Sequence, residues 1–382
     1  MRSDPGFGIY IHWPFCAAKC PYCDFNSHVR PTVDHDDWRE ALLTDIRTQA
    51  ETTEKQTVTS IFFGGGTPSL MEPATVGALI DEVSRLWQVA NDLEVTLEAN
   101  PTSVEADRFR AFRTAGVNRI SMGIQSLNDS DLKALGRMHS AAEAMAAFDV
   151  ARENFDRISF DLIYARQNQT LAEWEKELTR ALDMAVDHLS LYQLTIEAGT
   201  RFGDLYDRGK LRGLPSEGLG ADLYDLTQAI CADHGMGAYE VSNHAREGSE
   251  CRHNLTYWRY GPYLGVGPGA HGRLLQGQER FETVSFSNPE KWLETVAAHG
   301  SGLKSSDRLS ETDAGHEYAL MCLRLTEGLE LSRYELISGH RLDQVRIDDL
   351  ISQELLRQNE DRIYTTAQGR PVLNGVLGAL LT

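Results

Sequence analysis

The chain has 382 residues, of which 41% are hydrophobic and 24% charged, and this composition is typical of a globular protein with a large domain and a smaller one. The net charge is −19, and an acidic surface of this size disfavours nucleic acid and anionic membranes as partners. The first residues lack the apolar core of a signal peptide, and no run of roughly 18 apolar residues occurs. We therefore expect a cytoplasmic protein that binds no nucleic acid.

Short apolar runs alternate with amphipathic stretches along the first two-thirds of the chain. The runs are rich in β-branched and aromatic residues and predict strands over Gly8–Trp13, Ser60–Phe63, Glu94–Glu98, Arg119–Gly123, Arg157–Ile163 and His188–Leu194. The stretches between them predict helices over Asp37–Thr52, Glu72–Trp87, Val104–Ala115, Ala141–Asn154 and Leu171–Val186. Strands that alternate with helices imply a parallel sheet, so the order predicts an α/β fold with a partial (β/α)6 barrel.

Polar residues recur where these predicted strands end. Cys16, Glu98, Gln125, Asp161 and the segment Gly64–Thr67 all lie at or just after a C-terminal strand end. That rim is where barrels carry their active sites, so we expect these residues to share one site.

The alternation of predicted strands and helices ends after the barrel region. We assign residues 1–235 to the barrel, 236–287 to a connecting region and 288–382 to a smaller, mostly helical domain. Within the connecting region, Arg259–Gly272 is rich in glycine and predicts an ordered, irregular loop. The end of the chain, Ile363–Thr382, predicts a strand, a turn at Gln368–Gly369 and a helix, which is compatible with a winged-helix-like domain.

Three of the six cysteines lie within eight positions near the start of the chain. Cys16, Cys20 and Cys23 have the spacing CxxxCxxC, which lets one loop place three thiolates around a [4Fe–4S] cluster. No fourth cysteine is nearby, so one iron stays open to an external ligand. A structural zinc site is the alternative, with His28 as its fourth ligand. Cys231 and Cys322 lie in predicted helices, and we expect them to belong to the core.

This cysteine pattern resembles that of the radical S-adenosylmethionine (SAM) superfamily. The segment Gly64-Gly65-Gly66-Thr67-Pro68 after the second predicted strand is similar to the family's glycine-rich segment, which receives the SAM amino group. The resemblance implies that SAM fills the open iron position. An electron from the cluster then cleaves SAM to the 5′-deoxyadenosyl radical.

A closer resemblance covers nearly the whole chain. Gly8–Cys16, Glu98–Pro101, Ser121–Ser126, Phe160–Tyr164 and Leu191–Thr195 are similar to segments of oxygen-independent coproporphyrinogen III oxidase and its relatives. The resemblance implies contacts to SAM from Tyr10, Gly65, Gly66, Thr67, Glu98, Gln125, Arg137 and Asp161, with Tyr22 packed beside it.

Two features separate this chain from the oxidase pattern. The oxidases have a further cysteine two places after the third cluster ligand, where this chain has Phe25, which we expect to pack against the cluster loop. The segment Arg252–Trp258 contains HNxxYW, which resembles the HemW branch, the radical SAM haem chaperones. Leu323–Gly328 also resembles that branch. The resemblance implies haem as cargo, an acceptor protein such as a respiratory one, and an electron donor for the cluster.

Within HNxxYW, His253 is the predicted haem ligand, because imidazole is a common axial ligand of haem iron. Arg252 is expected to offer a cation to a propionate, and Tyr257 and Trp258 flat faces to the ring. Cys251, which we expect to be a buried free thiol, and His271 are less favoured ligands, and His12 is expected to be structural.

Other possibilities stay open. The chain reads Tyr164-Ala165-Arg166-Gln167 where the family usually has Tyr-Gly-Leu-Pro, and an arginine on the SAM side of the rim would alter SAM affinity. The competing functions are oxidative decarboxylation of coproporphyrinogen III and radical SAM chemistry on another substrate. The sequence leaves open whether the chain is an enzyme and whether it forms a homodimer.

Overall fold

The computed structural model describes residues 5–381, so Met1–Asp4 and Thr382, at the outer ends of the first and last predicted domains, lie outside the described residues. Within these residues the centre of the molecule is a 12-stranded sheet. Six neighbouring strands of this sheet run parallel and form the predicted partial barrel: β1 (Phe7–Trp13), β4 (Thr57–Gly65), β5 (Gln88–Ala99), β6 (Arg119–Gln125), β7 (Arg157–Tyr164) and β8 (His188–Gln193).

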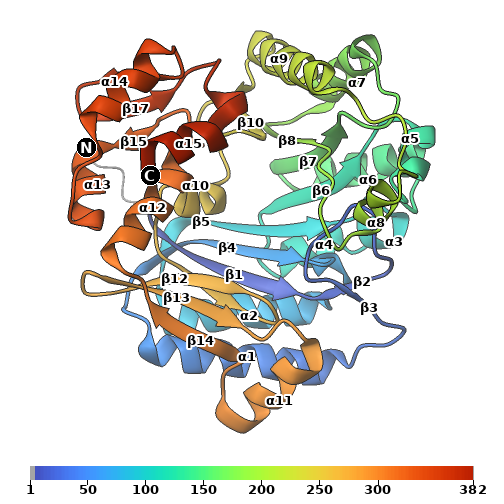
Figure 1. The fold of residues 1–382 in the computed structure, drawn as a ribbon. Coiled ribbons are helices and arrows are strands. Elements are labelled where there is room, and N and C mark those ends of the chain that lie inside the picture. The colour runs from blue at the N-terminus through green and yellow to red at the C-terminus, as the bar shows by residue number, and fades with distance from the viewer. Residues whose placement is uncertain (1–4, 382) are drawn as a thin grey trace.

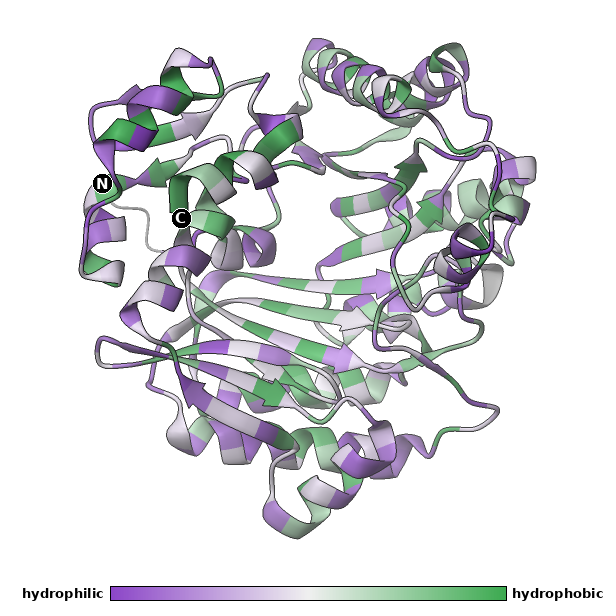
Figure 2. Cartoon of the chain, in the orientation of Figure 1, coloured by the Kyte–Doolittle hydropathy of each residue, from purple (hydrophilic) through white to green (hydrophobic). Residues whose placement is uncertain are grey.

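Alternation along each strand separates the core of the molecule from the barrel interior. In β1, Ile9 and Ile11 belong to the main hydrophobic cluster, whereas Tyr10 and His12 line an interior cavity. Successive side chains of a strand point to opposite faces of the sheet. Figure 2 shows this alternation as green and purple bands along the central strands. The outward face is covered by helices, and the inward face is left for polar and aromatic side chains.

Helices cover the outside of the barrel (Figure 1). The predicted helix over Val104–Ala115 is divided in two by a turn before Phe109, where the Arg108 guanidinium donates to the carbonyls of Ser69 and Met71. No helix in the described part of the chain has the length and apolarity needed to cross a membrane. The helices of this layer are α1 (His35–Thr52), α2 (Pro73–Leu86), α3 (Ser103–Ala106), α4 (Phe109–Thr114), α5 (Asp129–Ala134), α6 (Ala141–Asn154), α7 (Leu171–Met184), α8 (Arg201–Asp207) and α9 (Glu217–Asp233).

The sheet continues beyond the barrel on both sides. Beside β8 lie β10 (Asn243–Ala245) and β9 (Gly237–Ala238), and beside β1 lie β11 (Tyr263–Val266), β12 (His271–Gln276), β13 (Glu279–Ser285) and β14 (Leu303–Arg308). The prediction of an irregular loop over Arg259–Gly272 is therefore wrong for Tyr263–Val266, which pairs in parallel with β1, and for His271 and Gly272, which begin β12. The glycines serve a close approach instead, because a Cβ at Gly265 would lie 2.1 Å from the His271 carbonyl oxygen.

Helix α10 (Arg252–Trp258), which contains HNxxYW, packs against β1 and β4. Figure 1 shows it beside the C-terminal elements, on the side opposite the β2 (Phe15–Cys16) and β3 (His28–Val29) segments that frame the cysteine loop. HNxxYW thus lies toward the beginning of the barrel strands, and the cysteines lie at their C-terminal ends.

The C-terminal elements have a hydrophobic core of their own, built mainly of residues after Leu309. Their order is α12 (Glu311–Cys322), β15 (Leu329–Glu330), α13 (Leu331–Ser338), α14 (Gln344–Ser352), β16 (Leu356–Asn359), β17 (Arg362–Thr365) and α15 (Leu373–Leu381). This is the helix–strand–helix–helix–strand–strand order of a winged helix, as expected from the sequence.

The domain boundary that the sequence predicts at residue 288 stays a prediction. The central sheet, however, includes residues on both sides of it. Helix α11 (Pro289–His299) packs on α1 through Trp292 and Trp38, and β14 pairs with β13. These elements therefore share the core of the barrel, and the separate C-terminal core begins after Arg308.

Candidate functional site

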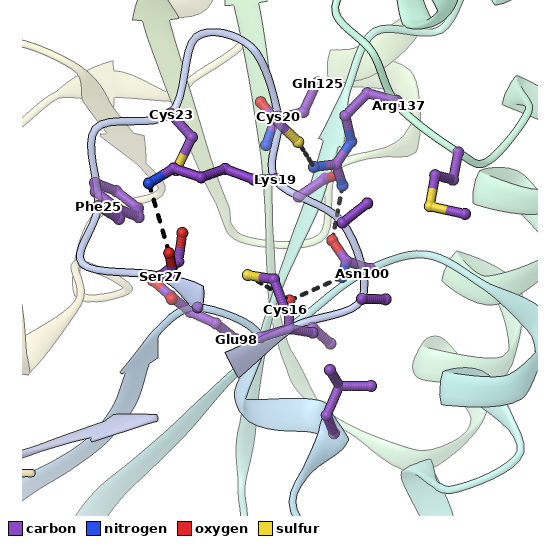
Figure 3. A pocket seen from close by; sticks show the side chains of 18 of the residues that line it. Cys16, Lys19, Cys20, Cys23, Phe25, Ser27, Glu98, Asn100, Gln125 and Arg137 are labelled. Carbon is purple, nitrogen blue, oxygen red and sulfur yellow. Dashed lines mark hydrogen bonds between the residues drawn. The ribbon is translucent and has the colours of Figure 1, made fainter. Parts of the chain in front are cut away.

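The rim residues predicted from the sequence meet in one cavity of about 360 Å³ at the C-terminal ends of the barrel strands. Figure 3 shows several of these side chains around a common opening. With the exception of Tyr10, the lining includes every residue predicted for the cluster or for SAM: Cys16, Cys20, Tyr22, Cys23, Gly65, Gly66, Thr67, Glu98, Gln125, Arg137 and Asp161. Strand ends that are distant in sequence thus form a single site.

The cysteine loop surrounds this opening with three sulfur atoms. The Thr67 hydroxyl donates to the Cys16 sulfur at 3.4 Å, and an Arg137 N–H donates to the Cys20 sulfur at 3.3 Å. The sulfurs of Cys16 and Cys20 therefore each have the kind of donor that supports a thiolate. Among residues 5–381 no three His, Cys, Asp or Glu side chains converge as ligands of a single metal ion. A cubane needs no such convergence, because each cysteine binds a different iron.

His28 does not complete a zinc site in this arrangement. Its Nε2 lies 3.2 Å from the Asn26 Oδ1, outside the cysteine cavity. Without His28, the cysteine loop contributes three thiols and no fourth ligand, which fits a site-differentiated [4Fe–4S] cluster better than zinc.

The glycine segment after β4 brings the main chain against the site. Gly65 has φ +111°, and its N–H donates to Glu98 Oε2 at 3.2 Å. A Cβ at Gly66 would lie 2.6 Å from the Phe15 carbonyl oxygen. Both positions thus need glycine, the first for its conformation and the second for the close approach. The result is a backbone cradle directly beside the cysteine loop.

Some polar atoms in the cavity lining are buried and have no hydrogen-bond partner among the described residues. They include Oε1 of Gln125 and Nε of Arg137. Gln125 also has φ +71°, an uncommon conformation for a residue other than glycine. Buried polar atoms are rarely left without hydrogen bonds, and such strain gathers at ligand sites. An amino acid ligand with a carboxylate and hydroxyls, such as SAM, fits these unsatisfied groups.

Two carboxyl groups of the site have pKa values above the ordinary range for their side chains. Burial, with a smaller contribution from Asp161, raises the pKa of Glu98 to about 8. Burial also raises the pKa of Asp161 to about 6. Two carboxyl groups with separated pKa values in one buried cavity are typical of a functional site.

A second cavity, of about 530 Å³, continues from the first into the barrel interior. The two cavities share Phe25, Gly65, Glu98, Ser121 and Asp161 in their linings. The second cavity is rich in aromatic side chains, which are Tyr10, Phe62, Tyr192, Tyr257, Trp258 and Tyr263. Its size is in the range of small-molecule sites, and flat apolar walls suit a flat ligand.

His253 lies on the wall of this second cavity and is 5% exposed. Its Nδ1 is 3.0 Å from the Ser60 hydroxyl, its ring stacks on Phe62 at 5.0 Å, and Nε2 has no hydrogen-bond partner among residues 5–381. Burial lowers the pKa of His253 to about 3, so the imidazole is neutral at physiological pH. A neutral, oriented imidazole is the form that binds a metal.

Several expected placements differ in the structure. Arg252 does not offer its charge to the cavity, because its guanidinium pairs with Asp92 at 2.6 Å on the outer surface. Phe25 is not packed against the cluster loop. It is 58% exposed at the mouth shared by the two cavities, since Asn26 ties the loop to the carbonyls of Pro268 and Ser287. Tyr10 lines the second cavity, and its predicted contact with SAM stays a prediction.

Arg166 is also placed differently from the expectation. Its side chain is buried and pairs with Glu177 of α7 at 2.5 Å and with Asp131 of α5 at 2.9 Å. It lines neither cavity, so it joins two helices behind the rim. The residue before it, Ala165, takes φ +57°, a conformation that the family's usual glycine adopts more easily.

The remaining residues singled out from the sequence lie as expected. Cys251 is a buried thiol, and burial raises its pKa to about 12. Cys231 and Cys322 are buried in their helices. His12 is hydrogen-bonded to the Tyr10 hydroxyl and the Asn26 carbonyl, a structural role. His271 is mostly exposed at the edge of the second cavity.

Sequence reasoning missed several polar residues of the two cavities, among them Asn100, Arg119 and Arg324. Asn100 accepts from Arg137 at 2.8 Å and orients it, and its place directly after a strand was the available signal. Arg119 and Arg324 line the second cavity. Arg119 lies on the inward-facing side of β6, in alternation with its neighbours, and strand periodicity could have indicated this. Arg324 lies far along the chain, and only the fold brings it here.

Comparison with known proteins supports this description. The family model of the radical SAM superfamily matches residues 10–181, and that of the HemN C-terminal domain matches residues 309–372. A Mus musculus protein named radical S-adenosyl methionine domain-containing protein 1, mitochondrial, is 38% identical over 98% of this chain and 87% of its own length. The heme chaperone HemW of Escherichia coli is 36% identical over the full length of both chains, as is that of Haemophilus influenzae.

Among solved structures, coproporphyrinogen III oxidase (HemN) from Escherichia coli superimposes with a TM-score of 0.82 over 98% of this chain and 90% of its own. At 23% identity this likeness establishes the shared fold alone. The full-length identity to relatives in several organisms is more specific. Together with the cysteine loop and the glycine cradle, it makes this chain a member of the radical SAM superfamily and, within it, of the HemW family.

Proposed function

We propose that this chain is a haem chaperone that binds haem in its second cavity and passes it to an acceptor protein. The observation that carries the proposal is the buried, neutral imidazole of His253 on the wall of an aromatic cavity. The tautomer in which Nδ1–H donates to the Ser60 hydroxyl, 3.0 Å away, leaves the lone pair of Nε2 for iron. The full-length relatives named heme chaperone HemW support the same conclusion.

The first cavity supports a [4Fe–4S] cluster on Cys16, Cys20 and Cys23, with SAM in the glycine cradle. When bound, these groups supply one-electron chemistry at the rim. The protein's own part is to hold and orient them. Arg137 is fixed by Asn100 and by the Gly123 carbonyl, and it can pair with the SAM carboxylate. Glu98 and Gln125 can take the amino group and the ribose.

Partners follow from this assignment. The cargo is haem, the recipient is a protein that needs haem, and the cluster requires an electron donor. The acidic net charge of −19 disfavours nucleic acid as a partner. Haem as cargo assigns the chain to porphyrin metabolism, and we propose that it acts in the cytoplasm.

The proposed haem ligand and the SAM cradle lie at different levels of the barrel. His253 faces Ser60 near the start of β4, and the glycine cradle begins four residues later at Gly64. At about 3.3 Å per strand residue, this puts roughly 13 Å of strand between the two levels. Phe25 stands where the oxidase pattern has a cysteine, and a phenyl ring can neither ligate iron nor relay a proton.

The deciding experiment assays both functions on one sample reconstituted anaerobically with iron and sulfide. Haem titration should give a saturable Soret change, and coproporphyrinogen III with SAM and reductant should give no protoporphyrinogen IX. Turnover of coproporphyrinogen without haem binding would assign the chain to the oxidases instead.

SAM affinity should depend on the ionisation of Glu98. In the protein without SAM its pKa is about 8, so at pH 6 the carboxyl is protonated and must lose a proton to face the positive sulfonium ligand. The ratio of wild-type to E98Q affinity should therefore rise between pH 6 and about 8, by up to about tenfold per pH unit, and then level off. Calorimetric titrations with cluster-loaded protein measure this ratio, in which titration of SAM itself cancels. A ratio that stays flat would remove Glu98 from the SAM site.

A further inference from the structure

One positively charged side chain in the wall of the second cavity, that of Arg324, comes from the C-terminal part of the chain. Arg324 follows α12 directly and lies within the region that matches the HemN C-terminal domain. It lines the cavity together with Tyr257 and Trp258 of the HNxxYW helix. The C-terminal domain therefore completes a cavity that is otherwise formed by the barrel and its connecting region.

The Arg324 side chain is held in place but incompletely neutralised. Its guanidinium carbon lies 4.5 Å from the centroid of the Trp258 ring, and its Nη2 is 3.4 Å from Glu240 Oε2. The other oxygen of Glu240 accepts from the Ser242 N–H at 2.8 Å and the Asn243 amide at 2.6 Å. The Glu240 contact is thus long, and that carboxylate is shared among three donors. Arg324 keeps further N–H groups for another acceptor.

The same wall has two buried donors that lack an acceptor. Nε of Arg324 and Nε1 of Trp258 are both buried, and neither has a partner among the described residues. A buried N–H without an acceptor costs free energy that an incoming acceptor would return. Unmatched donors beside the guanidinium of Arg324 point to a ligand with acceptor oxygens, such as a carboxylate.

We propose that Arg324 binds a carboxylate of the ligand in the second cavity, so that the C-terminal domain takes part in recognising it. The inference rests on the proposed function, because haem carries two propionates on a flat ring. His253 and Trp258 lie five residues apart on α10, which is roughly 7.5 Å along the helix axis. Iron at His253 and a propionate at Arg324 are therefore compatible with one ring lying along this helix.

The test compares haem with haem dimethyl ester, which has the same iron and ring but no carboxylates. Wild-type protein should bind haem roughly ten- to a hundredfold more tightly than the ester in Soret titrations, the range that a charge-assisted hydrogen bond supports. In R324Q the two affinities should converge through a loss on the haem side, whereas R324K should keep part of the preference because it keeps the charge.

R333Q is the matched control. Arg333 belongs to the same domain and also lies over an aromatic ring, that of Tyr318 at 5.1 Å, but it lines a different cavity. R333Q should keep the full preference for haem. Cluster absorbance should be the same in all variants and each should still unfold in one cooperative transition, which separates lost recognition from lost folding.

Two results overturn the proposal in distinguishable ways. If wild-type protein binds haem and its ester equally, or if R324Q keeps the preference, Arg324 does not bind a propionate, and the chaperone function still stands. If wild-type protein binds neither ligand, the proposed function itself fails and this inference fails with it.

Discussion

Replacing Cys16, Cys20 or Cys23 by alanine is expected to abolish cluster binding. All three sulfurs line one cavity, and no fourth cysteine lies in it to compensate. A cluster held by three thiolates loses a third of its protein ligands with each substitution. Reconstituted wild-type protein should show the broad absorbance of [4Fe–4S] centres at about 400 nm, and each variant should lose it.

C231A and C322A are the matched controls for the cluster variants. Both thiols are buried in helices away from the cavity, and burial raises the pKa of each to about 12, so neither forms a thiolate readily. These variants should retain the full absorbance and iron content. A protein with all three loop cysteines replaced that still bound four irons would contradict the assignment of the site.

Replacing His253 by alanine is expected to weaken haem binding at least tenfold and to shift the Soret band. Even an outer partner of a metal site typically contributes ten- to a hundredfold in affinity, and a direct ligand should contribute no less. The iron–sulfur absorbance should stay unchanged, because His253 lies outside the cluster cavity. The cluster absorbance of H253A is read before haem is added, and a haem titration of the same sample then measures the affinity and the Soret position.

Free imidazole provides the control for this variant, since the cavity left by the side chain can admit it. Added imidazole should restore the wild-type spectrum of H253A, which a merely destabilised protein would not show. Haem binding that is indifferent to H253A would place the iron ligand elsewhere. H271A and C251S would then be the next variants, although Cys251 is 1% exposed and its thiol is directed to Glu94.

The barrel and its rim site were predictable because both depend on local patterns. Each strand was marked by a short apolar run, and each rim residue by its position after such a run. Cys16, Glu98 and Asp161 converge because parallel strands end at the same edge. The pattern failed at Tyr263–Val266, where glycines that suggest a loop instead allow a strand to pass close to its neighbour.

The second cavity was predictable only in part, because its walls come from distant segments. HNxxYW marked His253, but a seven-residue helix has several faces, and periodicity alone could not show that Arg252 points to Asp92. The cation that lines the cavity is Arg324, which lies 71 residues after His253 in the sequence. Likewise, Arg166 was predicted to affect SAM binding because it lies near the rim in the sequence. Its side chain instead pairs with Asp131 of α5 and Glu177 of α7, behind the rim.

The wall shared by the two cavities has a consequence for how their ligands affect one another. Glu98 and Asp161 face both spaces, so a ligand that fixes the protonation of either carboxyl from one side changes the potential felt from the other. Such coupling is reciprocal by thermodynamic necessity: if SAM tightens haem binding by some factor, haem tightens SAM binding by the same factor. The binding of haem in the second cavity and the binding of SAM at the rim would then affect each other without any movement of the backbone.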